Sequence, residues 1–336
     1  MHHADSGQHW GPGIQSQGGK TEINNGTIIA TGGSESPGIG GSKDDCGTII
    51  INDGKIKSIS GGCSGASGIG GSRGYNLKKG SITINGGTIE ARADNNVNED
   101  GITLDYKDSD NFGTGIGAGA LSGTVAKGGD CCIPITINGG TVEAYGCSGN
   151  AAIGAGEGGN LKGKIKITGG YVKAVTSNHS KNLKRVAAAI GAGAEDSIAD
   201  LGGGVCDTKI EITGGTVIAQ TDEERKGGVL PQAIGHGAGD KRNDGVTIYE
   251  DAIIEHGKNE KNLELISQAD RMKAIDSCCV KITPPGQEDS ADLAGTAISP
   301  DAKGGSSMLP RLIIPIVIVV VVLIGAGVAL KKRKNK

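Results

Sequence analysis

The chain has 336 residues, a formal net charge of −3 and 62 glycines, but only 9 prolines and 2% aromatic residues. The slight negative charge, with no basic field over the main body, excludes the nucleic-acid-binding class. No G-X-Y period is present, which excludes collagen, and the glycines lie beside regularly spaced isoleucines and valines. This composition predicts an ordered repeat with tight turns.

The first residues, "MHHADSGQHW", contain no apolar stretch of the kind that a secretion signal needs. The next segment, "GPGI" at residues 11–14, is similar to "SPGI" at residues 36–39. We therefore expect the chain to begin inside a repeat, with an incomplete N-terminus.

A ten-residue unit such as "ITINGGTVEA", which begins at Ile135, recurs along most of the chain. If the second glycine of "NGG" is position zero, apolar residues fall at alternate positions on both sides of it, which is the pattern of β-strands. The zero positions are Gly26, Gly54, Gly87, Gly140, Gly170 and Gly215. Position −3 carries Ile23, Ile51, Ile84, Ile137, Ile167 and Ile212. The glycines stand where the chain must bend with a positive φ.

A third short segment closes each unit, and loops of variable length connect the segments. It consists of an isoleucine followed by glycine, at Ile39, Ile69, Ile116, Ile153, Ile190 and Ile234. Three short strands per turn, with glycine corners and insertions at fixed places, predict an all-β fold. We expect a parallel β-helix of about seven coils over residues 1–283. A stack of β-prisms or a β-roll is the competing architecture.

The repeat fades after residue 245. We interpret "VTIYEDAIIE", from Val246, as one degenerate coil and "VKIT", from Val280, as the start of a last one. The stretch between them, residues 259–275, is the best candidate for a helix outside the C-terminal apolar segment, and it would serve as a cap.

An uncharged segment that begins at Leu312 and ends at Leu330 predicts a transmembrane helix. The basic tail "KKRKNK", residues 331–336, follows at once, so the positive-inside rule places the tail in the cytoplasm and the β-helix outside the cell. Residues 284–311 are rich in Ser, Gly, Pro and Asp and predict a flexible stalk. A tail-anchored protein with a cytosolic domain is the rival topology.

Eight cysteines in an extracellular domain favour disulfides, but the register of the repeat does not bring them together. One group precedes a zero glycine by eight or nine residues, on alternate coils: Cys46, Cys131, Cys132 and Cys206. Equivalent residues two coils apart would be separated by about 10 Å, which is too far for a disulfide. A ladder of disulfides along one column is therefore not expected, whereas pairs across columns or through the long loops stay open.

No complete catalytic, cofactor or zinc motif is present in the sequence. "GAGEGG" at residues 154–159 matches GxGxxG, but no helix pattern follows it, so we interpret it as a corner of the repeat. His236 stands where other repeats carry Ala or Gly, and we expect it to be exposed at a corner. The loop "DNNVNED" offers weak calcium-ligand candidates, although its sixth position is not glycine; the alternative is a solvated insertion. These candidates are Asp94, Asn96, Asn98 and Asp100.

Outward strand positions give the best candidates for a ligand-binding face. Glu90, Glu143 and Lys173 share position +3 on successive coils. Tyr145 and Tyr171 lie nearby in the repeat and offer rings that stack on sugars. An ordinary charged surface is the alternative interpretation.

Two glycosylation motifs begin at Asn25 and Asn178, and a eukaryotic secretory pathway would modify them. The first of the two lies in a predicted tight turn.

The unit "ITINGGTVEA…AAIGAG" resembles the repeats of microbial surface proteins of the adhesin-like or carbohydrate-binding type. With its apolar segment and short basic tail, the chain is most similar to single-pass surface proteins of parasitic protists. The resemblance implies a membrane-anchored β-helix that adheres to glycans, matrix or neighbouring surface proteins, and it transfers no individual residues. Two alternatives stay open: a polysaccharide lyase or hydrolase with its site in the loops, and a structural spacer without a specific ligand.

Overall fold

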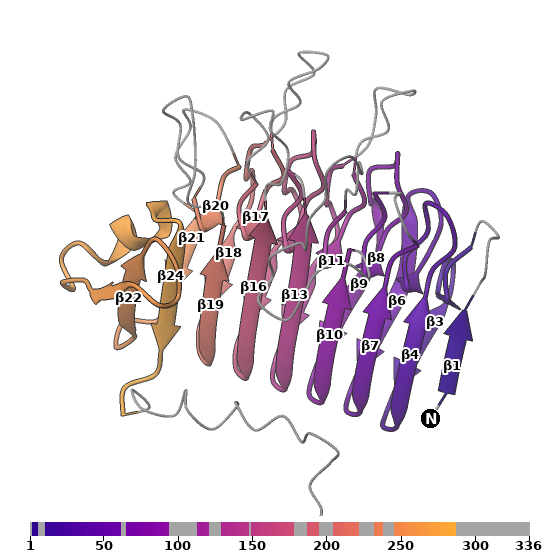
Figure 1. Ribbon diagram of the computed structural model, residues 1–336, viewed down its shortest axis with the longest axis horizontal. Coiled ribbons are helices and arrows are strands. Elements are labelled where there is room, and N and C mark those ends of the chain that lie inside the picture. Colours follow the sequence, from indigo (N-terminus) through magenta and orange to yellow (C-terminus); the bar gives the residue numbers. More distant parts are fainter. Residues whose placement is uncertain are drawn as a thin grey trace, which may run out of the picture. The chain divides into compact units, whose positions relative to one another are not determined.

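The computed structural model describes residues 2–5, 11–61, 65–93, 113–120, 129–147, 149–177, 187–194, 204–221, 232–237 and 245–286. Their strands form three sheets, A, B and C, and from β1 to β21 successive strands belong to sheets A, B and C in turn (Figure 1). Each strand of the repeat region pairs in parallel with the equivalent strand of the neighbouring coil. This is the arrangement of a parallel β-helix, as the repeat predicted.

Sheet A contains ten strands in the order β1 (His2–Asp5), β4 (Thr27–Thr31), β7 (Lys55–Ile59), β10 (Thr88–Arg92), β13 (Thr141–Cys147), β16 (Tyr171–Ser177), β19 (Thr216–Gln220), β24 (Cys279–Thr283), β22 (Ile253–Gly257) and β23 (Leu263–Leu265). Sheet B contains β2 (Ile14–Gln15), β5 (Ile39–Gly40), β8 (Ile69–Gly70), β11 (Ile116–Gly117), β14 (Ile153–Gly154), β17 (Ile190–Gly191) and β20 (Ile234–Gly235). Sheet C contains β3 (Lys20–Ile23), β6 (Asp45–Ile51), β9 (Lys79–Ile84), β12 (Ile135–Ile137), β15 (Ile165–Ile167), β18 (Ile210–Ile212) and β21 (Val246–Ile248). Sheets B and C contain seven strands each, which agrees with the prediction of about seven coils.

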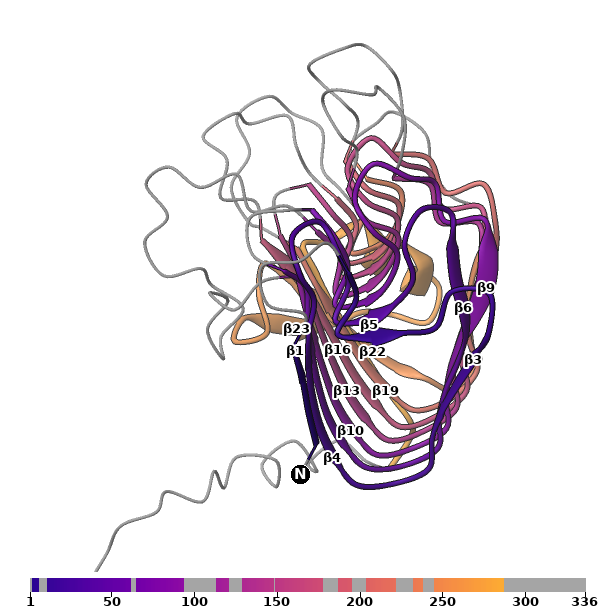
Figure 2. The same ribbon diagram turned by 90° about the vertical axis from the view of Figure 1, so that its right-hand side faces the viewer.

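The core lies inside the coils and is built from columns of identical residues. Figure 2 looks along the stack and shows β4, β10 and β13 of sheet A on one side and β3, β6 and β9 of sheet C on the other. In sheet C, Ile84, Ile137 and Ile167 lie side by side on neighbouring coils and are fully buried. Each such side chain contributes about 1.5–3 kcal/mol through burial. Alternation of inward and outward residues therefore sets the register of the whole stack.

Sheet B shows why its two-residue strands end in glycine. Gly154 has a φ of 138°, and a Cβ atom placed on it would lie 2.0 Å from the carbonyl oxygen of Gly191 on the next coil. No side chain fits at this distance. Glycine therefore allows the coils to approach closely at this corner.

An exposed ladder of amide side chains follows the turn between sheets C and A. Asn52 donates to Asn24 on the preceding coil at 2.7 Å, Asn85 donates to Asn52 at 2.7 Å, and Asn138 donates to Asn85 at 2.8 Å. The Thr168 hydroxyl continues the ladder by donating to Asn138 at 2.9 Å. Each side chain thus links its own coil to the preceding one.

Cysteine and leucine alternate along one inward column between sheets B and C. Isolated bridges place Leu77 beside Cys131, Cys131 beside Leu161, and Leu161 beside Cys206. This confirms that the cysteines of this column lie on alternate coils. Cys46, Cys131, Cys132 and Cys279 are free thiols, and no disulfide is found among the described cysteines. Burial raises the pKa of the Cys131 thiol to about 12.

The C-terminal end differs from the expected last coils. β21 continues sheet C in parallel, as expected for a degenerate coil, but β24 pairs with β19 in the antiparallel direction and β22 pairs antiparallel with β24. The interpretation of "VKIT" as the start of another coil was therefore wrong. The predicted helix over residues 259–275 was also wrong: this stretch holds β23 and the 3₁₀ helix η1 (Arg271–Asp276). Leu263 and Leu265 alternate with polar residues, and β23 pairs antiparallel with β22.

The predicted transmembrane segment, residues 312–330, lies outside the described residues, as do the tail and all of the stalk after residue 286. Within the described ranges, no helix has both the length and the apolar character needed to cross a membrane.

Candidate functional site

The predicted ligand-facing row lies on the outward face of sheet A. Glu90 on β10 is the register partner of Lys57 on β7 and of Glu143 on β13, and Glu143 is the partner of Lys173 on β16. The prediction that Glu90, Glu143 and Lys173 occupy equivalent places on successive coils is confirmed. The structure adds Lys57 to the same row.

Glu90 is held in its charged form. Lys57 Nζ lies 3.1 Å from its Oε1, and the guanidinium of Arg92 also pairs with that oxygen. Burial opposes the negative charge, but Arg92 and Lys57 outweigh it, so the pKa of the Glu90 carboxyl is lowered. A general acid for glycoside hydrolysis needs the opposite shift. Glu90 is therefore suited to an ion-pair network and not to proton donation.

Tyr145 is buried, which overturns its predicted role as a platform for sugar rings. Its side chain is only 2% exposed, its hydroxyl donates to Glu143 Oε2 at 3.0 Å, and the Arg92 guanidinium lies 4.5 Å from the ring centroid. Burial is the main reason that the pKa of the Tyr145 hydroxyl is raised. Sequence reasoning missed Arg92. The available signal was a charged residue at a position where the neighbouring coils carry Ile59 and Tyr145.

The turn between β22 and β23, residues 258–262, covers part of the same face. Lys173 Nζ lies 2.7 Å from Glu260 Oε2, and the Glu260 backbone N–H donates to Gln220 on β19 at 3.3 Å. Burial lowers the pKa of Lys173, but the Glu260 partner outweighs it, so the net pKa is raised. Tyr171 lies close to this pair and is half-buried. Both ends of the row on sheet A are thus neutralised, one by the pair of Lys57 and Glu90 and the other by Glu260.

Sheet C presents a different outward surface. Lys162, Lys164 and Lys166 alternate with buried residues along the segment that enters β15, and Lys209 stands on the next coil. Lys164 Nζ lies 2.6 Å from Oε1 of Glu211 on β18. The Lys164 hydrogen bond is the main reason that the pKa of the Glu211 carboxyl is lowered, and Lys166 and Lys209 add to it. One carboxylate thus lies within the field of three ammonium groups.

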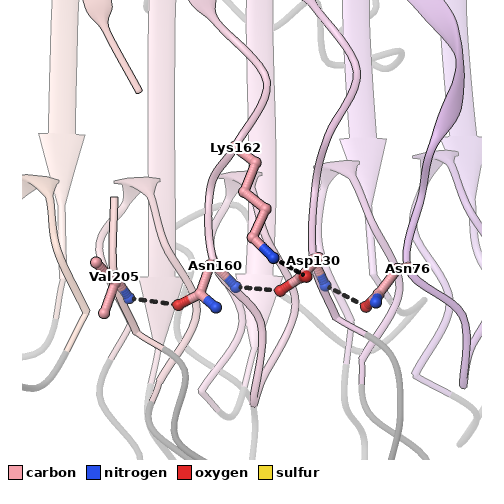
Figure 3. Close-up of polar contacts among 5 residues, drawn as sticks. All are labelled: Asn76, Asp130, Asn160, Lys162 and Val205. Carbon is pink, nitrogen blue, oxygen red and sulfur yellow. Dashed lines mark hydrogen bonds and ion pairs between the residues drawn. The ribbon is translucent and has the colours of Figure 1, made fainter. Parts of the chain in front are cut away.

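A polar ladder fixes the corner next to these lysines (Figure 3). The Asp130 N–H donates to Asn76 Oδ1 at 3.0 Å, the Asn160 N–H donates to Asp130 Oδ1 at 2.8 Å, and the Val205 N–H donates to Asn160 Oδ1 at 3.0 Å. Lys162 Nζ donates to the second carboxylate oxygen of Asp130 at 2.6 Å. Each carboxylate oxygen of Asp130 thus accepts a hydrogen bond from the next coil, and Lys162 is neutralised there.

The predicted calcium and glycosylation candidates do not form a second site among the described residues. The calcium candidates Asp94, Asn96, Asn98 and Asp100, and the glycosylation candidate Asn178, lie outside the described residues. Asn25 is exposed in its turn, where its Oδ1 accepts a hydrogen bond from the Gly26 N–H at 2.6 Å. Among the residues that the structure describes, no group of three His, Cys, Asp or Glu side chains converges as metal ligands would.

His236 is buried, so the expectation of an exposed corner residue was wrong. It is only 4% exposed, its Nδ1 accepts a hydrogen bond from the Cys206 N–H at 3.0 Å, and its own N–H donates to Gln232 Oε1 at 2.8 Å. The imidazole therefore fills an interior corner and links two coils.

Comparison with known proteins agrees with the fold. A family model described as a β-helix repeat matches residues 22–43, 135–157 and 165–194. No curated protein and no solved structure matches the chain. The family match supports a β-helix repeat protein, and it carries no evidence for the adhesin-like type or for an origin in parasitic protists.

Proposed function

We propose that this protein is a cell-surface binding module that attaches to glycans or matrix through the outward side chains of its β-helix. The observation that carries the proposal is the register of sheet C. Thr136, Lys166 and Glu211 come from separate segments of the chain and lie side by side on neighbouring strands. A rigid lattice of polar side chains is suited to a ligand that is itself extended.

Binding is favoured over polysaccharide cleavage by the state of the carboxylates on sheet A. Glu90 is paired with Lys57 and its pKa is lowered, and Glu143 accepts a hydrogen bond from the buried Tyr145. Hydrolysis requires a carboxylic acid that holds its proton near neutral pH. Nothing in this network favours such an acid, so we place the binding proposal first.

The same proposal includes membrane attachment through residues 312–330, with the β-helix outside the cell. Its support is the uncharged run itself and the basic tail that follows it. Two separate experiments test this part: carbonate extraction of membranes from expressing cells, and external protease treatment of intact expressing cells. The protein should stay in the membrane pellet, and the β-helix should be removed from intact cells. Release by carbonate would contradict the anchor.

A glycan array with the full chain in mild detergent tests the binding function. Saturable binding to a restricted set of glycans is expected, and it should vanish after thermal unfolding. No binding to any glycan or matrix protein would leave a structural spacer as the better description. Release of new reducing ends or unsaturated products from polysaccharides would instead establish the enzymatic alternative.

A further inference from the structure

We propose that the lysine face of sheet C, formed by Lys164, Lys166 and Lys209, binds an anionic polysaccharide that carries carboxylate or sulfate groups. The inference rests on the proposed function and names its ligand class and its face. Lys164 and Lys209 are direct neighbours on adjacent coils, because the flanking Ile165 and Ile210 are register partners. Neighbouring coils place such residues about 4.8 Å apart, and alternate residues of one strand are about 7 Å apart.

The charge of this face is unbalanced. Lys164 is paired with Glu211 at 2.6 Å, and the exposed Asp207, two residues before Lys209, is a second carboxylate at the edge of this face. Within the described part of the chain, no carboxylate lies within ion-pair distance of Lys166 or Lys209. Two ammonium groups are therefore left for an external anion. The pair of Lys164 and Glu211 is exposed and weakened by solvent, so an anionic ligand can compete with it.

The neighbouring coils limit the positive charge to this face. The adjacent outward positions carry Pro134 and Thr136 on one side, and Gly245 and Thr247 on the other. At the adjoining corner Lys162 is neutralised by Asp130 (Figure 3). The result is a positive strip between two uncharged ones, with hydroxyl groups beside it. Threonine hydroxyls both donate and accept hydrogen bonds, as sugar hydroxyls do.

The surroundings favour a polysaccharide over a nucleic acid or a lipid surface. The positions that flank the lysines hold no aromatic side chain, on which unpaired bases would stack. They hold no large apolar side chain, which a membrane-binding surface would insert. The net charge of −3 also gives the chain no general attraction for nucleic acid.

Equilibrium binding of the full chain in detergent to three oligosaccharides tests the inference. A sulfated heparin fragment and a carboxylated polygalacturonate fragment separate the two sources of negative charge, and a dextran fragment is the neutral control. The test variant is K166Q/K209Q, which removes the two lysines without an ion pair. The matched control is K55Q/K261Q, which makes the same change in net charge at exposed positions away from this face.

We expect at least one anionic fragment to bind, and to bind more weakly at higher salt because exposed charges are screened. K166Q/K209Q should weaken this binding about tenfold or more, whereas the control variant should change it less than about twofold. Bound ligand should also protect Lys166 and Lys209, but not Lys55, from acetylation as read by mass spectrometry.

The outcomes separate the two proposals. Equal effects of the two variants, or binding to neutral dextran alone, would overturn the lysine face and leave the glycan-binding function standing. Absence of binding to every glycan, here and on the array, would overturn both. Preferential binding to a DNA oligonucleotide or to anionic phospholipid vesicles, lost in K166Q/K209Q, would overturn the assignment to polysaccharide.

Discussion

Substitution of Gly154 by alanine tests whether the coils are stacked as closely as the structure has them. The backbone there has a φ of 138°, which only glycine adopts readily. The added Cβ atom would lie 2.0 Å from the Gly191 carbonyl oxygen, well inside the contact distance. That oxygen accepts a hydrogen bond from the Ala155 N–H at 2.9 Å. The coils can accommodate the methyl group only by moving apart.

The expected loss of stability has three parts. A backbone conformation reserved for glycine costs roughly 1–3 kcal/mol. Forcing a methyl group into close-packed surroundings costs roughly another 1–3 kcal/mol. Weakening the bond from Ala155 to Gly191 adds about 1 kcal/mol. We therefore expect Gly154→Ala to lower the free energy of unfolding by about 3–7 kcal/mol, which is severe for any protein domain.

Two matched variants separate these parts. Gly18 has a φ of 70° with open space around its would-be Cβ atom, so Gly18→Ala should cost only about 1–2 kcal/mol. Gly19 has neither a positive φ nor a close contact, and Gly19→Ala should be nearly neutral, within about 0.5 kcal/mol. Urea denaturation followed by circular dichroism measures all three. If Gly154→Ala were no more damaging than Gly18→Ala, the close stacking at sheet B would be refuted.

Three further predictions concern the core, the polar corner and the thiols. Ile137→Ala should lower the free energy of unfolding by about 2–5 kcal/mol, whereas the outward Thr136→Ala should stay within about 0.5 kcal/mol; similar values would contradict the inward and outward assignment. Because the hydrogen bond to Asp130 raises the pKa of Lys162, its stabilisation is complete below the unfolded value of about 10.4 and is lost as the pH rises through the folded value. The unfolding midpoint should therefore fall more above pH 10 in the wild type than in Lys162→Met, by a small amount since the lysine is exposed; parallel curves would count against the pair. Iodoacetamide at pH 8 should modify the half-buried Cys132 of the native protein faster than the buried Cys131, as followed by mass spectrometry. Equal rates would contradict the burial of Cys131.

Periodicity was enough to predict the repeating part of the fold. Ile84 and Ile137 carry the same offset from a zero glycine, and a parallel stack turns equal offsets into direct contact. The same reasoning placed Glu90 beside Glu143 although the chain between them contains a long insertion. Both results depend only on the alternation of inward and outward residues and on the glycine turns, and both can be recognised in a single sequence.

Features that depend on particular neighbours were not predictable in this way. Arg92 and Tyr145 share one offset, so their contact between neighbouring coils follows from the repeat, whereas the burial of this outward position does not. His236 is interior because its Nδ1 meets the Cys206 N–H of another coil. The direction of β24 could not be read from "VKIT", since an apolar strand alternates in the same way in either direction.

The lysine face shows the limit of the sequence-based choice of site. The shared position of Glu90, Glu143 and Lys173 predicted a ligand face on sheet A. In the structure Lys57 pairs with Glu90, and Glu260, from outside the row, pairs with Lys173. The excess of positive charge around Glu211 depends on which lysines form an ion pair. The ion pairs follow from the stacking of the coils and not from the order of residues in one segment.

The central claim is that separate segments of the chain lie in one fixed register, and a new disulfide tests it most directly. Cys132 follows Cys131, which pairs with Leu161, so Cys132 and Lys162 are neighbours on adjacent coils. Their Cα atoms should be about 4.8 Å apart, within the range of a disulfide. On mild oxidation, Lys162→Cys should form a disulfide with Cys132 that mass spectrometry detects. Asp207→Cys, two coils from Cys132 and thus about 10 Å away, should not. A disulfide in the second variant and none in the first would contradict the register on which both proposals rest.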